Sequence, residues 1–478
     1  MNRLGARLLL AILGGIFQAG ALPPLGWWAL ELFGLALLLR SIRGARPPEA
    51  ALLGVAWGTA GLDVPARWVL AAARARGGGT LLPLLALGVL AATPGLFGLV
   101  HALLARARLR IAIVAPFAWV ALEELRGRVP IFPCSWFGLS HAVAFGSPAL
   151  VQVTALVGAS GLGLLLAASS VLLESAAYLL LEKRSRGVVH LALGLGAPVI
   201  VWQLGFLVVC SAVPTEAQLR TALQTVIVQD PSSEQARLLL SLRGIKKARD
   251  DSTPSVDALL WPGDGWPRDP FASGRLEPSL LGIAERFGHV FVLGCPRPCA
   301  GGLAPSVLAI APDGRELGEH REGGEPSVVD IGRERIGLLL GSELSSGDAV
   351  RALVARGATV IFVAANDRPE WPEEARLQAA SEAVLRAVEV HRPILYAAAS
   401  GPSLSLDPIG RPYRALRAEG EQGFILSRTT GPRDLSLYAR AGHATGPLAI
   451  LVLAGCVVWT AVQRRPSRSA AAAASASR

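Results

Sequence analysis

The chain has 478 residues, of which 52% are hydrophobic and 17% charged, with a formal net charge of +10. Its mean hydropathy of +0.45 is too high for a soluble enzyme of this length, and the composition predicts several membrane spans. No basic patch with interleaved aromatic residues appears in the polar part of the chain, so the positive charge does not indicate a nucleic-acid partner.

Apolar runs follow one another through the first 213 residues, and one more lies near the C-terminus. They cover residues 8–22, 25–39, 51–73, 81–105, 111–122, 150–181, 188–213 and 447–462. A membrane span needs about 20 residues. The second and fifth runs are short by that measure, but about eight spans remains the best count. We do not interpret the first run as a cleaved signal peptide, because a second apolar run follows it directly.

Basic residues gather at alternate ends of these runs. One set of ends carries Arg3, Arg7, Arg40, Arg43, Arg46, Arg106, Arg108, Arg110, Lys183, Arg184, Arg186, Arg464, Arg465, Arg468 and Arg478. The opposite loops carry only Arg74, Arg76, Arg126 and Arg128. By the positive-inside rule, both termini are expected in the cytoplasm. The long polar stretch between the seventh and eighth runs then lies outside it.

This polar stretch, residues 214–445, alternates short β-branched segments with helical patterns. Strands are predicted at 223–228, 258–261, 290–293, 307–310, 335–340, 359–363 and 394–398, and helices at 278–287, 347–356 and 373–390. Such alternation predicts a layered α/β domain, and about 230 residues suffice for one core. The predicted organisation is therefore a bundle (1–213), the α/β domain (214–445), a last span (446–463) and a disordered tail (464–478).

The five cysteines are Cys134, Cys210, Cys295, Cys299 and Cys456. Cys210 and Cys456 lie in apolar runs, where packing explains them. For Cys295 and Cys299, a disulfide, two unpaired thiols and a metal site with further ligands are all open. The histidines are scattered and support no metal site, and no cofactor is expected.

Three stretches resemble the apolipoprotein N-acyltransferases, a family that joins a membrane bundle to a carbon–nitrogen hydrolase (nitrilase-like) domain. The first is Trp119–Gly127 with Phe132, Pro133, Gly138, Gln152 and Gly158–Gly161; the second is Leu260–Pro262; the third includes Asn366, Asp367, Trp371, Gln378, Arg386–Glu389, Arg392, Pro393, Ser400, Gly401, Asp407–Gly410, Tyr438 and Gly442. The resemblance covers nearly the whole chain. It implies an αββα sandwich on the extracytoplasmic side of a bacterial inner membrane.

The family's chemistry, as the resemblance implies it, uses a Glu–Lys–Cys triad. A cysteine thiolate attacks a phospholipid ester and holds the acyl chain as a thioester, which the N-terminal amine of a lipoprotein then takes. Such a step needs a thiolate, a carboxylate to accept its proton and a cation near the developing oxyanion. The implied partners are therefore phospholipid, the lipoprotein N-terminus and the membrane.

All three triad positions depart from this pattern. The family's Glu position, after Trp-Pro, is Gly263 here, and its Lys position is Glu322. Its Cys position, after an apolar strand, is Gly341. The segment from Glu322 to Ile336 is also short where the family carries a long lipid-contacting lid.

Neighbouring residues offer partial replacements. Asp264, Arg321 and Ser342 each stand one residue from a triad position, and in a strand a slip of one residue turns a side chain to the other face. Glu343 matches a carboxylate that the family keeps beside its nucleophile. The other interpretation of Ser342 and Glu343 is that they cap the helix expected at 347–356 or line a loop.

We interpret the chain as an apolipoprotein N-acyltransferase-like membrane protein with impaired or lost catalysis, so that its status as an enzyme stays open. One alternative is a non-catalytic protein that binds lipid or lipoprotein. The other is a hydrolase with a site rebuilt around Asp264, Ser342 and Glu343.

Overall fold

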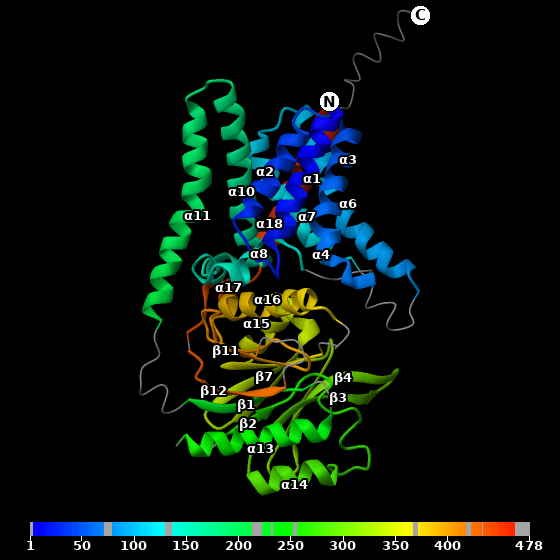
Figure 1. Cartoon of the computed structure of the whole chain (residues 1–478), viewed down its shortest axis with the longest axis vertical. Coiled ribbons are helices and arrows are strands. Elements are labelled where there is room, and N and C mark those ends of the chain that lie inside the picture. The colour runs from blue at the N-terminus through cyan, green and yellow to red at the C-terminus, as the bar shows by residue number, and fades with distance from the viewer. Residues whose placement is uncertain are drawn as a thin grey trace, which may run out of the picture. The chain divides into compact units, whose positions relative to one another are not determined.

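The computed structural model describes residues 3–70, 79–129, 136–212, 222–230, 233–251, 256–366, 371–416, 422–432 and 434–463. Cys134, Asp367 and the predicted disordered tail lie outside these residues. The chain forms two compact units (Figure 1). One comprises residues 1–142, 160–200 and 444–478, and the other residues 143–159 and 201–443.

The first unit is helical, and every apolar run found in the sequence holds a helix. The helices and helical turns are α1 (Arg3–Ala21), α2 (Leu30–Ile42), α3 (Pro47–Gly58), η1 (Thr59–Asp63), α4 (Val64–Ala66), α6 (Leu81–Arg106), α7 (Ile111–Arg126), α8 (Leu139–Gly146), α10 (Thr154–Leu181), α11 (Arg186–Ser211) and α18 (Thr445–Gln463); α8, α10 and α11 extend into the second unit. Among the described residues, α1, α6, α10, α11 and α18 are long and apolar enough to cross a membrane. The other runs give shorter or interrupted helices, so the count of eight spans stays a prediction.

Small residues let the first helices of this unit approach one another closely. A Cβ atom added at Gly54 of α3 would lie 2.1 Å from the carbonyl oxygen of Pro94 in α6, and one at Gly14 of α1 would lie 2.7 Å from that of Gly34 in α2. Backbone contact of this kind is typical of helices packed inside a membrane, where dispersion forces rather than water exclusion hold them together.

The second unit contains two six-stranded sheets. The first has the order β12-β1-β2-β3-β4-β5, and the second β11-β10-β9-β8-β7-β6. The strands are β1 (Leu223–Gln229), β2 (Ala258–Leu260), β3 (Val290–Cys299), β4 (Gly302–Ile310), β5 (Glu316–Arg321), β6 (Ser327–Ile331), β7 (Glu334–Leu340), β8 (Val360–Ala365), β9 (Ile394–Ala398), β10 (Ser403–Leu406), β11 (Pro412–Leu416) and β12 (Gly423–Thr429). Strands β1–β3 run parallel, as do β7–β9.

The helices of the second unit are α9 (Pro148–Val151), α13 (Glu234–Asp250), α14 (Pro278–Phe287), the 3₁₀ turn η2 (Gly341–Ser345), α15 (Gly347–Ala355), α16 (Glu373–Val390) and α17 (Leu437–Ala441). In Figure 1, α13 and α14 lie beside the first sheet, and α15 and α16 beside the second. The predicted αββα sandwich is confirmed, and each of the seven predicted strands is present.

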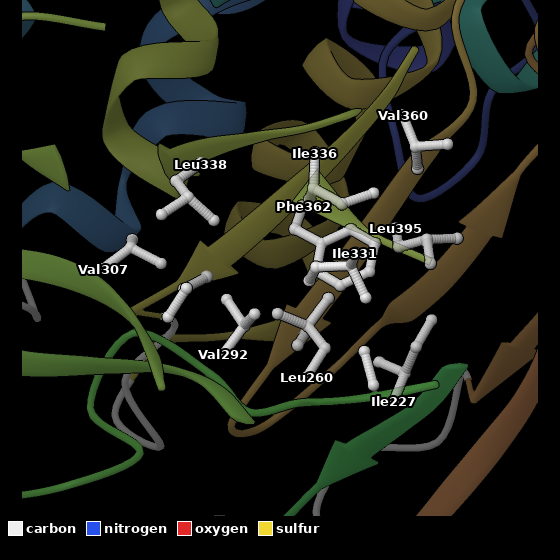
Figure 2. Packing of buried hydrophobic residues seen from close by; sticks show 14 of the residues in the cluster. Ile227, Leu260, Val292, Val307, Ile331, Ile336, Leu338, Val360, Phe362 and Leu395 are labelled. Atoms are coloured by element: carbon white, nitrogen blue, oxygen red, sulfur yellow. The ribbon is translucent and has the colours of Figure 1, made fainter. Parts of the chain in front are cut away.

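The main core lies between the two sheets. Alternate residues of β1, β2 and β3, among them Ile227, Leu260 and Val292, face Ile336 and Phe362 of the second sheet (Figure 2). A second cluster fills the other face of the first sheet, where Trp261 and Phe291 pack with residues of α13 and α14. Both faces of each central strand are therefore buried, which explains their near-continuous apolar sequences.

We predict that Gly294→Ala destabilises the protein, because the added Cβ would lie 2.3 Å from Cα and the carbonyl oxygen of Gly263. Overpacking of this kind costs about 1–3 kcal/mol. The measurement is thermal unfolding of the purified chain in detergent. Gly301→Ala is the matched control, since a Cβ there meets nothing within 4 Å. Equal melting temperatures for the two variants would contradict the prediction.

Candidate functional site

The candidate site lies where β7 and β8 end, at one edge of the second sheet. Strand β7 runs into η2, which begins at Gly341, and β8 ends at Ala365. The backbone N–H of Gly263 donates a 2.9 Å hydrogen bond to the carbonyl oxygen of Ala365. A Cβ added at Gly341 would lie 2.9 Å from Cα and Cβ of the same residue. Gly263 and Gly341 therefore both lie against Ala365.

Neither glycine has room for a side chain. A Cβ added at Gly263 would stand 2.9 Å from the amide nitrogen of Asn366 and 3.0 Å from the carbonyl oxygen of Ala364. These neighbours are backbone atoms of the second sheet, which cannot rotate away as the end of a side chain could. The present backbone thus excludes both a Glu at 263 and a Cys at 341.

Glu322, which stands at the family's Lys position, also lies next to η2. Ser342, the second residue of η2, donates a 2.6 Å hydrogen bond from Oγ to Oε1 of Glu322. Both side chains are exposed. The sequence-based alignment therefore selected positions that the fold does bring together, but their chemistry is a hydroxyl next to a carboxylate. The bond has the length expected between a nucleophile and its base.

Glu343 has a different set of partners. Its Oε2 lies 2.7 Å from Nε2 of His320 and accepts a 3.1 Å hydrogen bond from the N–H of Leu340. Its Oε1 accepts a 2.9 Å bond from the N–H of Gly323. Glu343 therefore joins the ends of β5 and β7, and the expectation that it caps the following helix is wrong. Ser346 caps α15 instead, accepting from the N–H of Ala349.

Charge pairing sets the protonation of this pair. Burial alone would raise the pKa of Glu343, but the hydrogen bonds from His320 and Gly323 outweigh it and lower the pKa below its usual 4.5. Burial alone would lower the pKa of His320, but its bond to Glu343 raises the pKa above 6.5. An imidazolium–carboxylate pair therefore forms in mildly acidic and near-neutral solution.

Arg321 points away from this pair. Its side chain is 44% exposed and its Nε lies 2.6 Å from Oε1 of Glu319, whereas His320 is only 3% exposed. The alternation of a strand accounts for the difference, because successive residues face opposite sides. The cation nearest in sequence to the family's Lys position is therefore turned outward.

Asp264 lines a cavity of about 770 Å³ with Arg237, Cys295 and Asn366. Arg237 donates there to the carbonyl oxygens of Asp230 and Gly265, at 3.0 and 2.8 Å. Ser342 and Glu343 are not among the residues that line this cavity. The three residues proposed for a rebuilt site thus have different neighbours. Asp264 lines the cavity, Ser342 bonds Glu322, and Glu343 pairs with His320.

Cys295 and Cys299 are both free thiols, so the disulfide alternative is wrong. Three residues of extended strand lie between them, and four steps of about 3.3 Å place their Cα atoms about 13 Å apart, about twice the Cα separation that a disulfide can bridge. Cys295 is 1% exposed, and burial raises the pKa of its thiol to about 12. Among the described residues, no three His, Cys, Asp or Glu side chains are grouped so as to hold a metal ion.

A buried network of charged residues lies next to η2. It was not predicted from the sequence, because Arg386–Glu389 served there only as part of the family resemblance. Arg386 of α16 donates from Nε to the carbonyl oxygen of Leu344 in η2, at 2.9 Å, and pairs with Glu382 and Glu389. Burial alone would lower the pKa of Arg386, but the two carboxylates raise it above its usual value. Their spacing of three and four residues on a helix was the available signal.

Glu389 also accepts a 2.6 Å hydrogen bond from the N–H of Ala159. The preceding residue, Gly158, has φ 73° and interrupts α10. A Cβ at Gly158 would lie 2.6 Å from the ring of Tyr438, so this position needs glycine for both its conformation and its contact. The network thus connects η2, α16 and the start of α10.

Comparisons with known proteins find several similar chains. Residues 14–172 match the family model described as the apolipoprotein N-acyltransferase N-terminal domain. The apolipoprotein N-acyltransferase of Gloeobacter violaceus is 28% identical over 97% of this chain and 96% of its own, and that of Methylococcus capsulatus is 34% identical over 37% of this chain and 36% of its own. An amidase of the nitrilase superfamily from Nesterenkonia is 20% identical, over 46% of this chain and 95% of its own, with a TM-score of 0.35.

We predict a pH-dependent effect of Glu343→Gln. The contribution of Glu343 is present above pH 4.5 and is lost as the pH falls through its lowered folded pKa. That of His320 is present below pH 6.5 and is lost as the pH rises through its raised folded pKa. The drop in melting temperature caused by Glu343→Gln should therefore be largest between pH 4.5 and pH 6.5, and it should become smaller at lower and at higher pH.

Glu325→Gln serves as the control, because that side chain pairs with exposed Arg356 and only its backbone oxygen meets His320. Thermal unfolding in detergent across this pH range measures both variants. A Glu343→Gln deficit that does not change with pH would show that the pair is not ionised as described.

A second prediction concerns the thiols. Iodoacetamide should alkylate exposed Cys299 in the folded protein, whereas Cys295 should react only after unfolding, because it is buried with a pKa near 12. Peptide mass spectrometry without reductant reads both sites. Rapid native labelling of Cys295 would contradict its placement, and a mass loss of two hydrogens would indicate a disulfide.

Proposed function

The chain belongs to the apolipoprotein N-acyltransferase family, and from this membership we propose that it is a lipoprotein-maturation membrane protein in which the thioester route has been lost. It binds phospholipid and the N-terminus of lipoproteins without transferring the acyl chain between them. The observation that carries this proposal is the contact of Gly263 and Gly341 with Ala365, which leaves no space for the acid or the thiol.

The buried thiol of the sandwich, Cys295, does not replace the missing one. Thioester formation needs a thiolate, and the buried Cys295, with its pKa near 12, stays protonated at neutral pH. Cys295 also packs in the cluster between the first sheet and its helices, whereas Leu340, which leads to Gly341, packs between the two sheets. Cys295 therefore belongs to a different core cluster from the residue that leads to the family's nucleophile position, although it lines the same cavity as Gly263 and Asp264.

The proposed setting is the bacterial inner membrane, with the sandwich on the extracytoplasmic side. Five described helices are long and apolar enough to cross a bilayer, and the basic residues at alternate ends of the apolar runs support this orientation. The proposed division is a bundle at 1–213, the sandwich at 214–445 and a last span at 446–463.

A second candidate function is a slow hydrolase, which the Ser342–Glu322 hydrogen bond specifically favours. In this version Ser342 attacks the ester carbonyl, and Glu322 accepts the hydroxyl proton and passes it to the departing alcohol. Water then cleaves the acyl-serine to release the fatty acid and restore Ser342. Glu343 supports the loop through His320, Gly323 and Leu340 and does not serve as the base. The pair is exposed, so bulk water competes for both groups and weakens the activation.

Complementation tests the proposal. We expect the full-length chain, expressed in bacteria depleted of their own apolipoprotein N-acyltransferase, to leave lipoproteins diacylated, as read by mass spectrometry with expression confirmed on a blot. The triple variant Gly263→Glu, Glu322→Lys, Gly341→Cys should also fail, because the backbone around Ala365 excludes the new side chains. A member of the family that carries the Glu–Lys–Cys triad is the positive control. Triacylation by the natural chain would overturn the proposal.

Acyl labelling separates the two candidate functions. A phospholipid with a radiolabelled acyl chain should leave no covalent label on the natural chain. An ester-linked label that disappears in both Ser342→Ala and Glu322→Gln, but not in Glu343→Gln, would establish the hydrolase instead.

A further inference from the structure

A second cavity, of about 410 Å³, lies away from the vacated triad and shares none of its residues. Short segments far apart in the sequence line it: the turn from α9 into α10, the C-terminal part of α11, the end of α16, the turn after β10 and the start of α17. Leu156, Leu204, Val208, Val388, Ile409 and Leu437 contribute most of the apolar wall. All of these residues belong to the sandwich-containing unit.

The few polar residues that line this cavity are engaged elsewhere or neutral. Gln152 donates from Nε2 to the carbonyl oxygens of Ile409 and Pro148, at 2.9 and 2.7 Å. Ser436 donates to the carbonyl of Glu389 and accepts from Ala439. Burial and Arg392 lower the pKa of His391, so it is neutral at pH 7. The lining therefore favours an apolar ligand, because it provides apolar surface and no charged partner for a charged ligand.

The wall formed by α11 is held in place by backbone contacts. A Cβ at Gly205 would lie 1.8 Å from the carbonyl oxygen of Ala149, so helix and turn touch directly. At the end of the helix, Arg411 donates to the carbonyls of Val209 and Ala212 and pairs with Asp407. A cavity between walls fixed in this way exists before any ligand arrives, and its volume falls in the range of small-molecule sites.

The surroundings of the cavity indicate what fills it. Helix α11 is long and apolar enough to cross a membrane, and its side chains beside the cavity are exposed, Leu204 by 61% and Leu207 by 64%. Leu156 and Leu437 on the other walls are exposed as well. A contiguous apolar surface on a membrane-length helix is in contact with lipid, so the molecules available to the cavity are those of the bilayer.

We propose that this cavity binds one acyl chain of a membrane phospholipid. The inference rests on the phospholipid binding in the proposed function and gives that binding a location apart from the vacated triad. Arg440 lies three residues after Leu437 in α17 and is exposed, which places a cation on the same helix face as the cavity wall.

Photocrosslinking tests the proposal. The full-length chain is reconstituted in vesicles of phosphatidylethanolamine and phosphatidylglycerol that contain a trace of phosphatidylethanolamine with a diazirine at the end of one acyl chain. After irradiation, the label should map to peptides containing Val388 or Ile409, as well as to α11. These two residues belong to the α/β sandwich rather than to a membrane span, so labelling there reports occupancy of the cavity.

A matched pair of variants provides the control. Val208→Phe places a ring in the cavity and should reduce labelling of the Val388 and Ile409 peptides several-fold. Leu207→Phe makes the same change at a neighbouring exposed residue outside the lining and should leave this labelling unchanged. Ala155→Phe fills the cavity from the opposite wall, so a folding defect in one variant does not decide the result; folding is checked by thermal unfolding.

Unchanged labelling in both cavity-filling variants would overturn the proposal, as would labelling restricted to the exposed face of α11. Free fatty acid added to the vesicles should leave the label on the Val388 and Ile409 peptides in place; loss of this label to free fatty acid would identify a different ligand and also overturn the proposal. Failure here leaves the complementation result unaffected, because complementation reads acyl transfer and crosslinking reads occupancy. The two proposals therefore fail separately.

Discussion

The buried pairing of Arg386 with Glu382 and Glu389 is the interaction on which the site end of the sandwich depends. Three charged side chains are withdrawn from water there, and breaking such a pair from one side costs about 3–5 kcal/mol, because the charge left behind is uncompensated. The network also uses its remaining hydrogen-bonding capacity on Leu344 and Ala159. The turn η2 is therefore fixed to α16 through the carbonyl oxygen of Leu344.

At the same end of the molecule, close packing fills the space beside Gly263 and Gly341. Gly263 and Gly341 let backbone segments approach closely around Ala365, and Gly294 lets its strand approach Gly263 in the same way. Sandwich cores gain dispersion energy from such contact, and each contact forbids a side chain. Restoring three residue types alone would therefore not restore a site, because the sheets would first have to move apart.

Much of the sandwich could be predicted from sequence, since its central strands are buried on both faces and appear as apolar runs. Helix α13 escaped prediction because its sequence is charged and its apolar stripe weak. Strands β5, β6 and β10–β12 escaped because short, partly exposed strands carry little pattern. The family resemblance pointed to positions 263, 322 and 341; Gly263 and Gly341 both lie against Ala365, and Glu322 accepts a hydrogen bond from Ser342. The resemblance did not reveal the His320–Glu343 pair, because these residues are 23 positions apart and only the fold brings them together.

The break in α10 bears on how the protein is made. Beyond Gly158 the helix begins again with the N–H of Ala159 directed at the carboxylate of Glu389, so an acidic side chain neutralises the positive end of the helix dipole there. That carboxylate lies 230 positions further along the chain. During synthesis from the N-terminus, α10 therefore leaves the ribosome long before its cap, and water or lipid headgroups must solvate this end until the sandwich has folded.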